Sequence, residues 1–149
     1  MDEMAHHERN ESLDASVPCG ATAASNEYPL EQLTGSIITA AVQVHKELGP
    51  GFLESVYENA MILELQARGH KVERQVELNV NYRGQLVGQH RLDLLVDDAV
   101  VLELKSVEAL AAVHTAQLRS TLRAANKRIG LLMNFNQRTL TSGVRRVIN

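Results

Sequence analysis

The stretch RLDLLVDDAVVLELKS (residues 91–106) decides the fold. Two apolar runs flank Asp97-Asp98, which predicts two strands joined by a tight turn. Both runs are apolar on both faces, which is typical of strands in a sheet interior covered by helices. Each run nevertheless carries ionisable residues, namely Arg91 and Asp93 in the first and Glu103 and Lys105 in the second. Buried charges are costly unless they are paired or hold a metal, so these residues require an explanation.

The spacing of these residues predicts that three of them meet. Side chains alternate along a strand, so Glu103 and Lys105 share one face. A loop of residues 97–99 would place Asp93 directly opposite Glu103. Two carboxylates that close repel each other, so positive charge is expected between them. Lys105 supplies some of it, and magnesium or manganese, which select oxygen ligands, would supply more. A surface-facing acidic pair beside a lysine is the alternative that spacing alone leaves open.

The rest of the chain predicts one α/β domain with a mixed sheet. Helices are expected at about 34–48, with Thr34 as N-cap and Gly49 as stop, at 52–67, ending at Gly69, and at 112–125. Strands are expected at 72–82, from the Arg83-Gly84 turn to 96, at 100–105 and at 129–135, with a loop and a short strand or helix at the end. Residues 1–28 lack a hydrophobic period and are expected to be a disordered acidic leader, which leaves residues 29–149 as the domain.

Composition narrows the class of protein. The chain has 149 residues, a single cysteine and no apolar run near the roughly 20 residues of a membrane span. No signal peptide is visible, so a cytoplasmic location is expected. The net charge of −3 is unevenly distributed. Residues 1–33 hold seven acidic residues against one arginine, whereas residues 34–149 hold 14 basic and 11 acidic residues. The basic balance of the domain permits a polyanionic partner.

Two motifs carry a resemblance to known proteins. Asp93, nine intervening residues and Glu103-Leu104-Lys105 have the form D-x₉-E-x-K, which resembles the signature of the PD-(D/E)XK nuclease superfamily. GPGFLESVYE (49–58) is similar to the motif that names the GxxExxY proteins, with Gly51, Glu54 and Tyr57 in register. The segments HKELGPG, VERQVEL, HRLDLLVDD, LELKSV and LLMNF resemble that family's pattern in order, over about residues 33–149.

The resemblance implies a fold and a site. The fold is the restriction-endonuclease-like α-β-β-β-α-β core, a mixed central sheet flanked by helices and preceded here by an extra N-terminal helix. Asp93 and Glu103, with the backbone carbonyl of Leu104, would bind one or two Mg²⁺ (or Mn²⁺) ions. Lys105 would be the catalytic lysine that positions and activates the attacking water. Leu92 stands where the superfamily name has proline.

Two helices are expected to add residues to this site. In such nucleases the first helix often supplies a glutamate, and Glu54 and Glu58 lie one turn apart. Glu54 lies nearer the apolar stripe and at the motif position, so it is predicted to face the site; a simple preference of glutamate for a helix N-terminus is the alternative. The helix after the E-x-K strand presents a glutamine in RecB-like members, which is Gln117 here. Thr121 stands where those relatives have tyrosine.

Basic residues near this last helix predict contacts with phosphates. They are Arg119, Arg123, Lys127 and Arg128. A solvated helix face explains them equally well. His90 and His114 are expected to be structural or exposed. With two phenylalanines, three tyrosines and no tryptophan, extensive base stacking is not expected.

The favoured function is therefore a metal-dependent nuclease that hydrolyses phosphodiester bonds in nucleic acid, DNA before RNA. One alternative is a non-catalytic module that binds nucleic acid or another partner on a nuclease fold. Another is a structural domain whose polar cluster is a buried ion-pair network. A membrane partner is not expected, and a homodimer is left open.

Overall fold

The computed structural model describes residues 18–149, and residues 1–17 lie outside the described part. Its elements, in chain order, are α1 (Pro18–Leu48), α2 (Glu54–Ala67), β1 (Val72–Tyr82), β2 (Gln85–Val96), β3 (Val100–Lys105), α3 (Ala112–Ala125), β4 (Ile129–Asn134), the 3₁₀ turn η2 (Leu140–Gly143) and β5 (Val144–Ile148). This order confirms the predicted α-β-β-β-α-β core with an extra helix before it. The segment after β4, left open by the sequence, forms the short turn η2 and then the strand β5.

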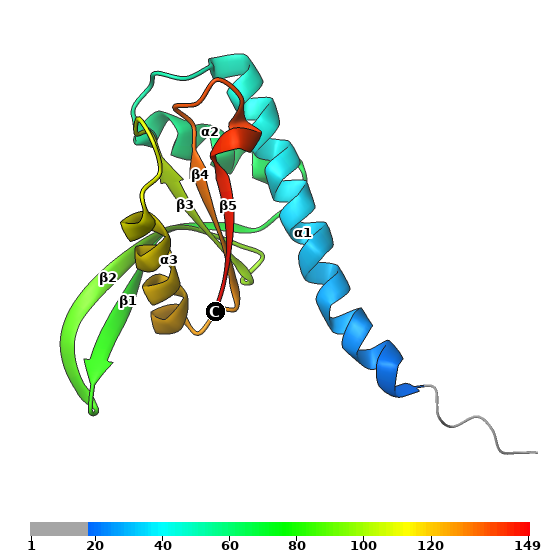
Figure 1. Ribbon diagram of the computed structural model, residues 1–149, viewed down its shortest axis with the longest axis vertical. Coiled ribbons are helices and arrows are strands. Elements are labelled where there is room, and N and C mark those ends of the chain that lie inside the picture. Colours follow the sequence, from blue (N-terminus) through cyan, green and yellow to red (C-terminus); the bar gives the residue numbers. More distant parts are fainter. Residues whose placement is uncertain (1–17) are drawn as a thin grey trace, which may run out of the picture. The chain divides into compact units, whose positions relative to one another are not determined.

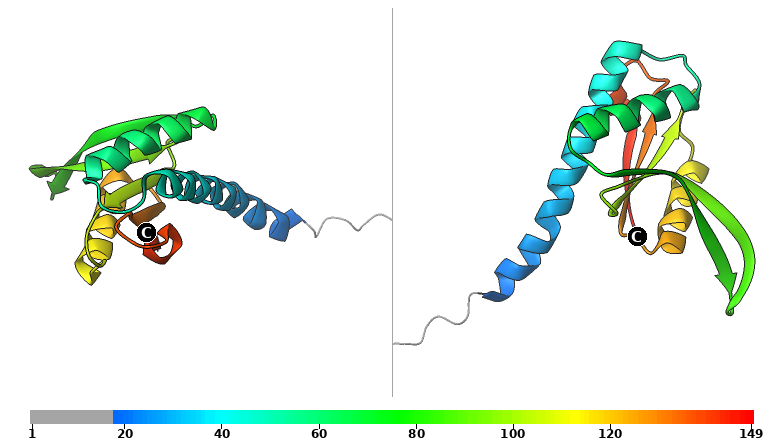
Figure 2. Two further views of the ribbon diagram at one scale, coloured as in Figure 1. Left: turned by 90° about the horizontal axis from the view of Figure 1, so that it is seen from above. Right: turned by 180° about the vertical axis from the view of Figure 1, so that it is seen from behind.

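The five strands form one mixed sheet in the order β1-β2-β3-β4-β5. β3 and β4 are parallel, and the other neighbours are antiparallel. A parallel pair needs a crossover connection, and α3 provides it. α3 lies on one face of the sheet, and α2 lies on the other together with the part of α1 from residue 33 onward (Figures 1 and 2). Helices on both faces explain why the central strands are apolar on both sides.

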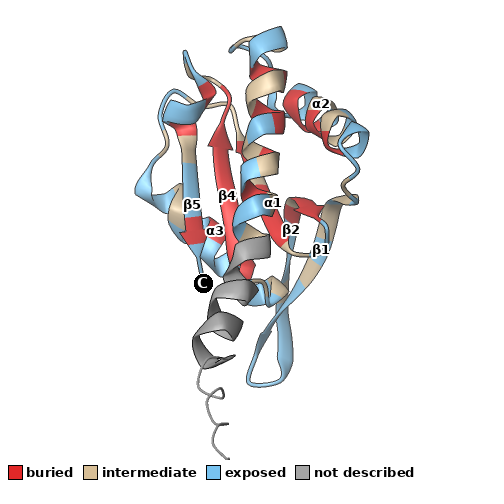
Figure 3. Cartoon of the chain, turned by 90° about the vertical axis from the view of Figure 1, so that its right-hand side faces the viewer, coloured by how far each residue is buried: buried red, intermediate tan, exposed pale blue. Residues whose placement is uncertain are grey.

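The core is densest around β4, which is buried along its whole length (Figure 3). On the α3 side, Leu118 and Leu122 pack with Val101 of β3 and Leu132 of β4. At Gly130, a Cβ atom would lie 3.0 Å from the Leu118 side chain, so the absence of a side chain there lets α3 approach the sheet closely. Tight packing of this kind fixes where the ends of β3 and α3 lie.

The predicted turns are confirmed. Gly49 follows α1 with φ 69°, and Gly69 follows α2 with φ 90°. Arg83 and Gly84, with φ 51° and 79°, form the two-residue connection between β1 and β2. Positive φ at both central residues matches the twist of the flanking strands, as in type I′ hairpins. The connection makes β1 and β2 one long hairpin that extends past the rest of the sheet (Figure 1).

The start of the first helix differs from the prediction. α1 begins at Pro18, so Thr34 is not its N-cap. Thr34 is fully buried, and its Oγ1 accepts a hydrogen bond from Arg146 Nη2 of β5 at 2.5 Å. A tertiary partner therefore uses the hydroxyl that a cap would use. Of the predicted leader, residues 1–17 lie outside the described residues and residues 18–28 belong to α1; the domain boundary at residue 29 stays a prediction.

Candidate active site

The turn between β2 and β3 has the predicted length. Val96 pairs with Val100 and Leu94 with Leu102, which leaves a loop of residues 97–99. Continuing this register by one residue on each strand places Asp93 opposite Glu103. The two carboxylates therefore belong to the same face of the hairpin, as the spacing predicted.

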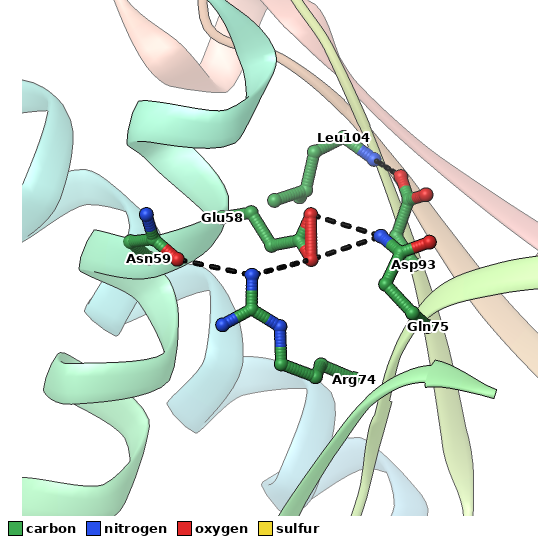
Figure 4. A network of polar contacts seen from close by, with 6 residues as sticks. All are labelled: Glu58, Asn59, Arg74, Gln75, Asp93 and Leu104. Atoms are coloured by element: carbon green, nitrogen blue, oxygen red, sulfur yellow. Dashed lines mark hydrogen bonds and ion pairs between the residues drawn. The ribbon is translucent and has the colours of Figure 1, made fainter.

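Asp93 lies where β2 separates from β3. The last ladder pair between the two strands is Leu94 with Leu102. Beyond it, Asp93 Oδ2 accepts a hydrogen bond from the backbone N–H of Leu104 at 2.9 Å (Figure 4). The side chain thus satisfies a β3 donor that the ladder no longer reaches. Burial raises the pKa of Asp93, and this hydrogen bond opposes the rise. The carboxylate is held at the point where the two strands open.

Glu103 has the most unusual environment of the candidate residues. Burial, together with the nearby negative charge of Asp93, raises its pKa from 4.5 to about 7, although Lys105 acts in the opposite direction. Its Oε1 atom is buried and has no hydrogen-bond partner. A buried polar atom without a partner costs about 1–3 kcal/mol, more if it is charged. Such an oxygen is suited to accept a proton or to bind a cation.

Lys105 follows on the same strand face as Glu103. It is half-buried, and within the described residues its ammonium group forms no hydrogen bond or ion pair. Its charge nevertheless lowers the pKa of both Asp93 and Glu103. The lysine is therefore close enough to stabilise two carboxylates while its N–H donors stay available. A structural ion-pair network would instead join Lys105 directly to a carboxylate.

The two glutamates of α2 have different surroundings. Glu58 is only 8% exposed, and its two oxygens accept hydrogen bonds from Gln75 Nε2 of β1 at 3.0 and 2.9 Å. Arg74 Nη2 lies 3.4 Å from Glu58 and also donates to Asn59 (Figure 4). Glu58 therefore attaches α2 to β1. Glu54 is exposed, and its negative charge raises the pKa of both Asp93 and Glu103. Glu54 is the helix carboxylate that remains available to the site.

Tyr57 holds the loop in front of α2. Its hydroxyl donates to the carbonyl of Gly49 at 2.5 Å and accepts from the N–H of Phe52 at 3.1 Å. Its ring stacks on Phe135, with centroids 4.6 Å apart. Ser106, directly after β3, donates from Oγ to the carbonyl of Phe52 at 2.7 Å. These contacts fix the loop beside the end of the E-x-K strand, next to Glu54.

A cleft of about 440 Å³ opens beside this loop. It is lined by Gly51, Phe52, Leu53, Glu54, Ser106 and Asn136. Three residues near the site were not predicted from the sequence: Ser106, Asn136 and Gln75. Polar residues directly after the E-x-K strand and after β4 were the available signal for the first two. Gln75 had no comparable signal, because its role depends on an unusual backbone angle.

The residues predicted on and after α3 lie elsewhere. Gln117 and Arg123 border a groove between α3 and the β1–β2 hairpin, and the residues that line it do not include Asp93, Glu103 or Lys105. Lys127 Nζ donates to the carbonyl of Asp98 at 2.8 Å and so supports the β2–β3 turn. The structure also places two further basic residues, Arg119 and Arg128, on the exposed surface. Contacts of these basic residues with phosphate stay a prediction.

The two histidines have structural partners. The ring Nε2 of His90 lies 2.7 Å from Thr121 Oγ1, which joins the hairpin to α3. The Nδ1 atom of His114 accepts the N–H of Ala111 at the start of α3, at 2.9 Å. The hydroxyl of Thr121 therefore links α3 to the hairpin. No contact links either histidine to the carboxylates in the described part of the chain.

The oxygen atoms of Asp93 and Glu103 are suitable ligands for a hard divalent cation, although they do not form a complete metal site. Across residues 30–149, no group of three or more His, Cys, Asp or Glu side chains is arranged to hold a metal ion. The two carboxylates of Asp93 and Glu103 are nevertheless adjacent, and one oxygen of Glu103 lacks a partner. Oxygen ligands of this kind are those that Mg²⁺ and Mn²⁺ select. Binding would satisfy the oxygen that the protein leaves without a hydrogen bond.

This fold and the Asp-Glu-Lys cluster at the opening of β2 and β3 are those of a nuclease-like α/β protein. The family model of the PD-(D/E)XK nuclease superfamily matches residues 31–147. The chain belongs to this superfamily. No curated protein and no solved structure matches it. Among the described helices, none is both long and apolar enough to cross a membrane.

Proposed function

We propose that this protein is a metal-dependent nuclease that hydrolyses phosphodiester bonds in nucleic acid. The observation that carries the proposal is the buried Oε1 of Glu103, which lacks a hydrogen bond and lies next to Asp93. Perturbed carboxylates of this kind are concentrated at functional sites. Superfamily membership makes phosphodiester hydrolysis the reaction that best accounts for them.

Asp93, Glu103 and the carbonyl of Leu104 are the groups that would hold Mg²⁺ or Mn²⁺. When bound, such an ion supplies Lewis-acid stabilisation of the phosphate oxygens and lowers the pKa of water. Glu103 must lose its proton for this role, and its raised pKa makes that loss dependent on pH. The N–H of Leu104 donates a hydrogen bond to Asp93 and so orients its carboxylate beside that of Glu103.

Lys105 and Glu54 are the groups that would act on the substrate side. The ammonium of Lys105 has three donors and no partner among the described residues, so it can bind a phosphate oxygen or orient the attacking water. Its positive charge opposes the negative charge that develops in the transition state. Glu54, exposed at the start of α2, can accept a hydrogen bond from that water. These roles of Lys105 and Glu54 are part of the proposal.

Within the superfamily, we assign the chain to the GxxExxY proteins. Support comes from the motif residues Gly51, Glu54 and Tyr57. Tyr57 holds the loop that contains Gly51, and that loop ends at Glu54 beside the carboxylates. Tyr57 and Glu54 thus each have a structural reason for their positions in this motif. A cytoplasmic location is compatible with the proposal and stays a prediction from the sequence.

A cleavage assay tests the proposal. The protein is incubated with duplex DNA, single-stranded DNA and RNA, with magnesium, with manganese and with a chelator. We expect cleavage that requires metal and that Lys105→Ala abolishes. An exposed-lysine variant, Lys71→Ala, serves as the matched control and should keep activity. Cleavage that persists in Lys105→Ala, or that a chelator does not stop, would refute the assignment.

A non-catalytic binding module is the second candidate. Two observations favour it: three metal-ligand side chains are not gathered across the described residues, and Gln117 lies at a groove apart from the carboxylates. This reading predicts that the protein binds nucleic acid without cleaving it under any metal condition. It also predicts that Lys105→Ala and Glu103→Gln leave the affinity unchanged.

A further inference from the structure

A groove of about 790 Å³ lies on the α3 side of the long hairpin, away from the carboxylate cluster. One wall is the outer part of the hairpin, residues 79–90, which we call the arm. The other wall is α3, through residues such as Gln117 and Arg123. In Figure 1 the arm extends beyond the sheet beside α3. The groove is therefore formed by two elements that the core leaves partly uncovered.

The two elements that form the groove carry charge of one sign, and Arg123 is the arginine among the groove's lining residues. The arm (NVNYRGQLVGQH) and α3 (AVHTAQLRSTLRAA) together contain Arg83, Arg119 and Arg123 and no aspartate or glutamate. The other polar groups are mainly neutral amides, among them Asn79, Gln89 and Gln117. Arginines donate to phosphates, and amides both donate to and accept from base edges. The complementary ligand is a polyanion that also carries hydrogen-bonding edges.

The end of the arm combines aromatic, apolar and cationic groups. Tyr82 is 61% exposed, and the guanidinium of Arg83 lies 5.2 Å from the centre of its ring. Leu86 and Val87 are 59% and 61% exposed. Large apolar side chains gathered at an exposed tip indicate a contact surface.

The base of the arm is held firmly. His90 contacts Thr121 of α3 at 2.7 Å, and Leu78 packs against the cluster of α3 and sheet residues. His90 precedes Asp93 by three residues on the same strand. At about 3.3 Å per residue, the separation is roughly 10 Å, or about three base-pair steps along one DNA strand. A duplex of several base pairs is therefore long enough to contact both the arm and the carboxylates.

We propose that the arm and α3 form a cradle for duplex DNA, with the two-stranded arm entering the major groove. This inference rests on the proposed nuclease function and specifies its substrate. The major groove of B-form DNA is about 12 Å wide and admits a two-stranded β-ribbon. The major groove of A-form RNA is too deep and narrow for side chains to read. The geometry therefore selects duplex DNA over duplex RNA.

The test is a binding titration in chelator, so that no cleavage occurs. Fluorescence anisotropy is measured with a labelled DNA duplex, an RNA duplex and a DNA single strand of the same sequence. We expect the DNA duplex to bind most tightly. Arg119→Ala with Arg123→Ala should reduce the slope of log affinity against log salt by about 2. Tyr82→Ser with Leu86→Ser should weaken duplex binding by roughly tenfold or more and leave the salt slope unchanged.

Matched controls are Arg138→Ala and Leu63→Ser, which alter an exposed arginine and an exposed leucine away from the arm. Both should bind like wild type. Equal affinity for the RNA and DNA duplexes, or unchanged binding by both double variants, would overturn the cradle while leaving the nuclease proposal intact. Duplex binding through the arm without cleavage in any metal would refute the nuclease proposal alone. An arm double variant that changes only the oligomeric state would assign the tip to a protein interface and also overturn the cradle.

Discussion

Gln75 lies directly opposite Asp93 in the β1–β2 register, yet the two residues form no ladder pair. The pairs on either side, Arg74 with Leu94 and Val76 with Leu92, are both present. Gln75 has φ 51°, a left-handed conformation that is uncommon for a residue with a side chain. The ladder is therefore interrupted at the position of Asp93, and the amide of Gln75 is bonded to Glu58 instead. The interruption attaches α2 to the sheet beside the candidate site.

The substitution Gln75→Gly tests how the left-handed backbone and the side-chain amide of Gln75 each contribute to stability. Glycine tolerates the left-handed conformation, which should contribute up to about 1 kcal/mol of stability. Loss of the donors to the buried Glu58 should cost about 1.5–3 kcal/mol. The free energy of unfolding should therefore fall by about 0.5–3 kcal/mol, as measured by urea denaturation. Asn126→Gly is the control, because Asn126 has φ 55° at the exposed end of α3. It should hold or gain stability, and equal losses in both variants would contradict the role of the amide.

Substitution of either carboxylate should weaken metal binding without lowering the stability of the metal-free protein. Asp93→Asn or Glu103→Gln removes a negative ligand while keeping nearly the same shape, so Mn²⁺ affinity in calorimetry should fall at least tenfold. The same changes relieve repulsion between neighbouring carboxylates, so the melting temperature without metal should hold or rise. Lys105→Ala should keep Mn²⁺ binding. If all three variants melt far below wild type and manganese stabilises none of them, nor wild type, the cluster is structural.

The raised pKa of Glu103 sets a pH dependence for the metal-free protein. Its folded-state pKa of about 7 lies above the ordinary value of 4.5, so the folded state binds this proton more tightly than the unfolded chain. The resulting stability is fully present below about pH 4.5 and is lost as the pH rises toward 7. Thermal melts in chelator should show wild type losing stability over this window relative to Glu103→Gln. A constant difference between the two would contradict the shift.

Manganese should reverse this trend. Metal binds the deprotonated carboxylates, so the rise in melting temperature that manganese causes should grow as the pH increases through the same window. Calcium, which prefers longer bonds and more ligands, is a useful comparison ion. A manganese shift that is independent of pH would place the metal away from Glu103.

Tyr57→Phe should loosen the loop before α2 without disturbing the aromatic stack. It removes the hydroxyl that joins Gly49 to Phe52, so the N–H of Phe52 loses its partner. We expect a loss of about 1–2 kcal/mol in the free energy of unfolding and faster hydrogen exchange at Phe52. Tyr82→Phe is the control, since Tyr82 is 61% exposed, and it should be neutral. Unchanged exchange at Phe52 would show that the loop is held by other contacts.

Local rules were enough to predict much of this protein. The three-residue loop and the alternation of β2 and β3 placed Asp93, Glu103 and Lys105 on one face, because side-chain direction in a strand has a period of two. The turns at Gly49, Gly69 and Arg83-Gly84 followed from the conformations that glycine permits. The PD-(D/E)XK superfamily followed from the D-x₉-E-x-K spacing of Asp93, Glu103 and Lys105. These features depend on neighbours in the chain, and the sequence contains that information directly.

Tertiary packing decided the rest, because it brings together residues whose separation in the chain carries no periodic signal. Thr34 was predicted to be a helix N-cap, but its hydroxyl accepts a hydrogen bond from Arg146 on the last strand. Glu58 is distinguished from Glu54 by its burial and by its contacts with Arg74 and Gln75. No pattern in the sequence indicates the left-handed backbone of Gln75. Lys127 supports the β2–β3 turn through Asp98, a contact that the sequence did not indicate, and its contact with phosphate stays a prediction. Whether a charged side chain is free or engaged depends on burial and on partners far away in the sequence, and those are set only when the sheet and its helices pack together.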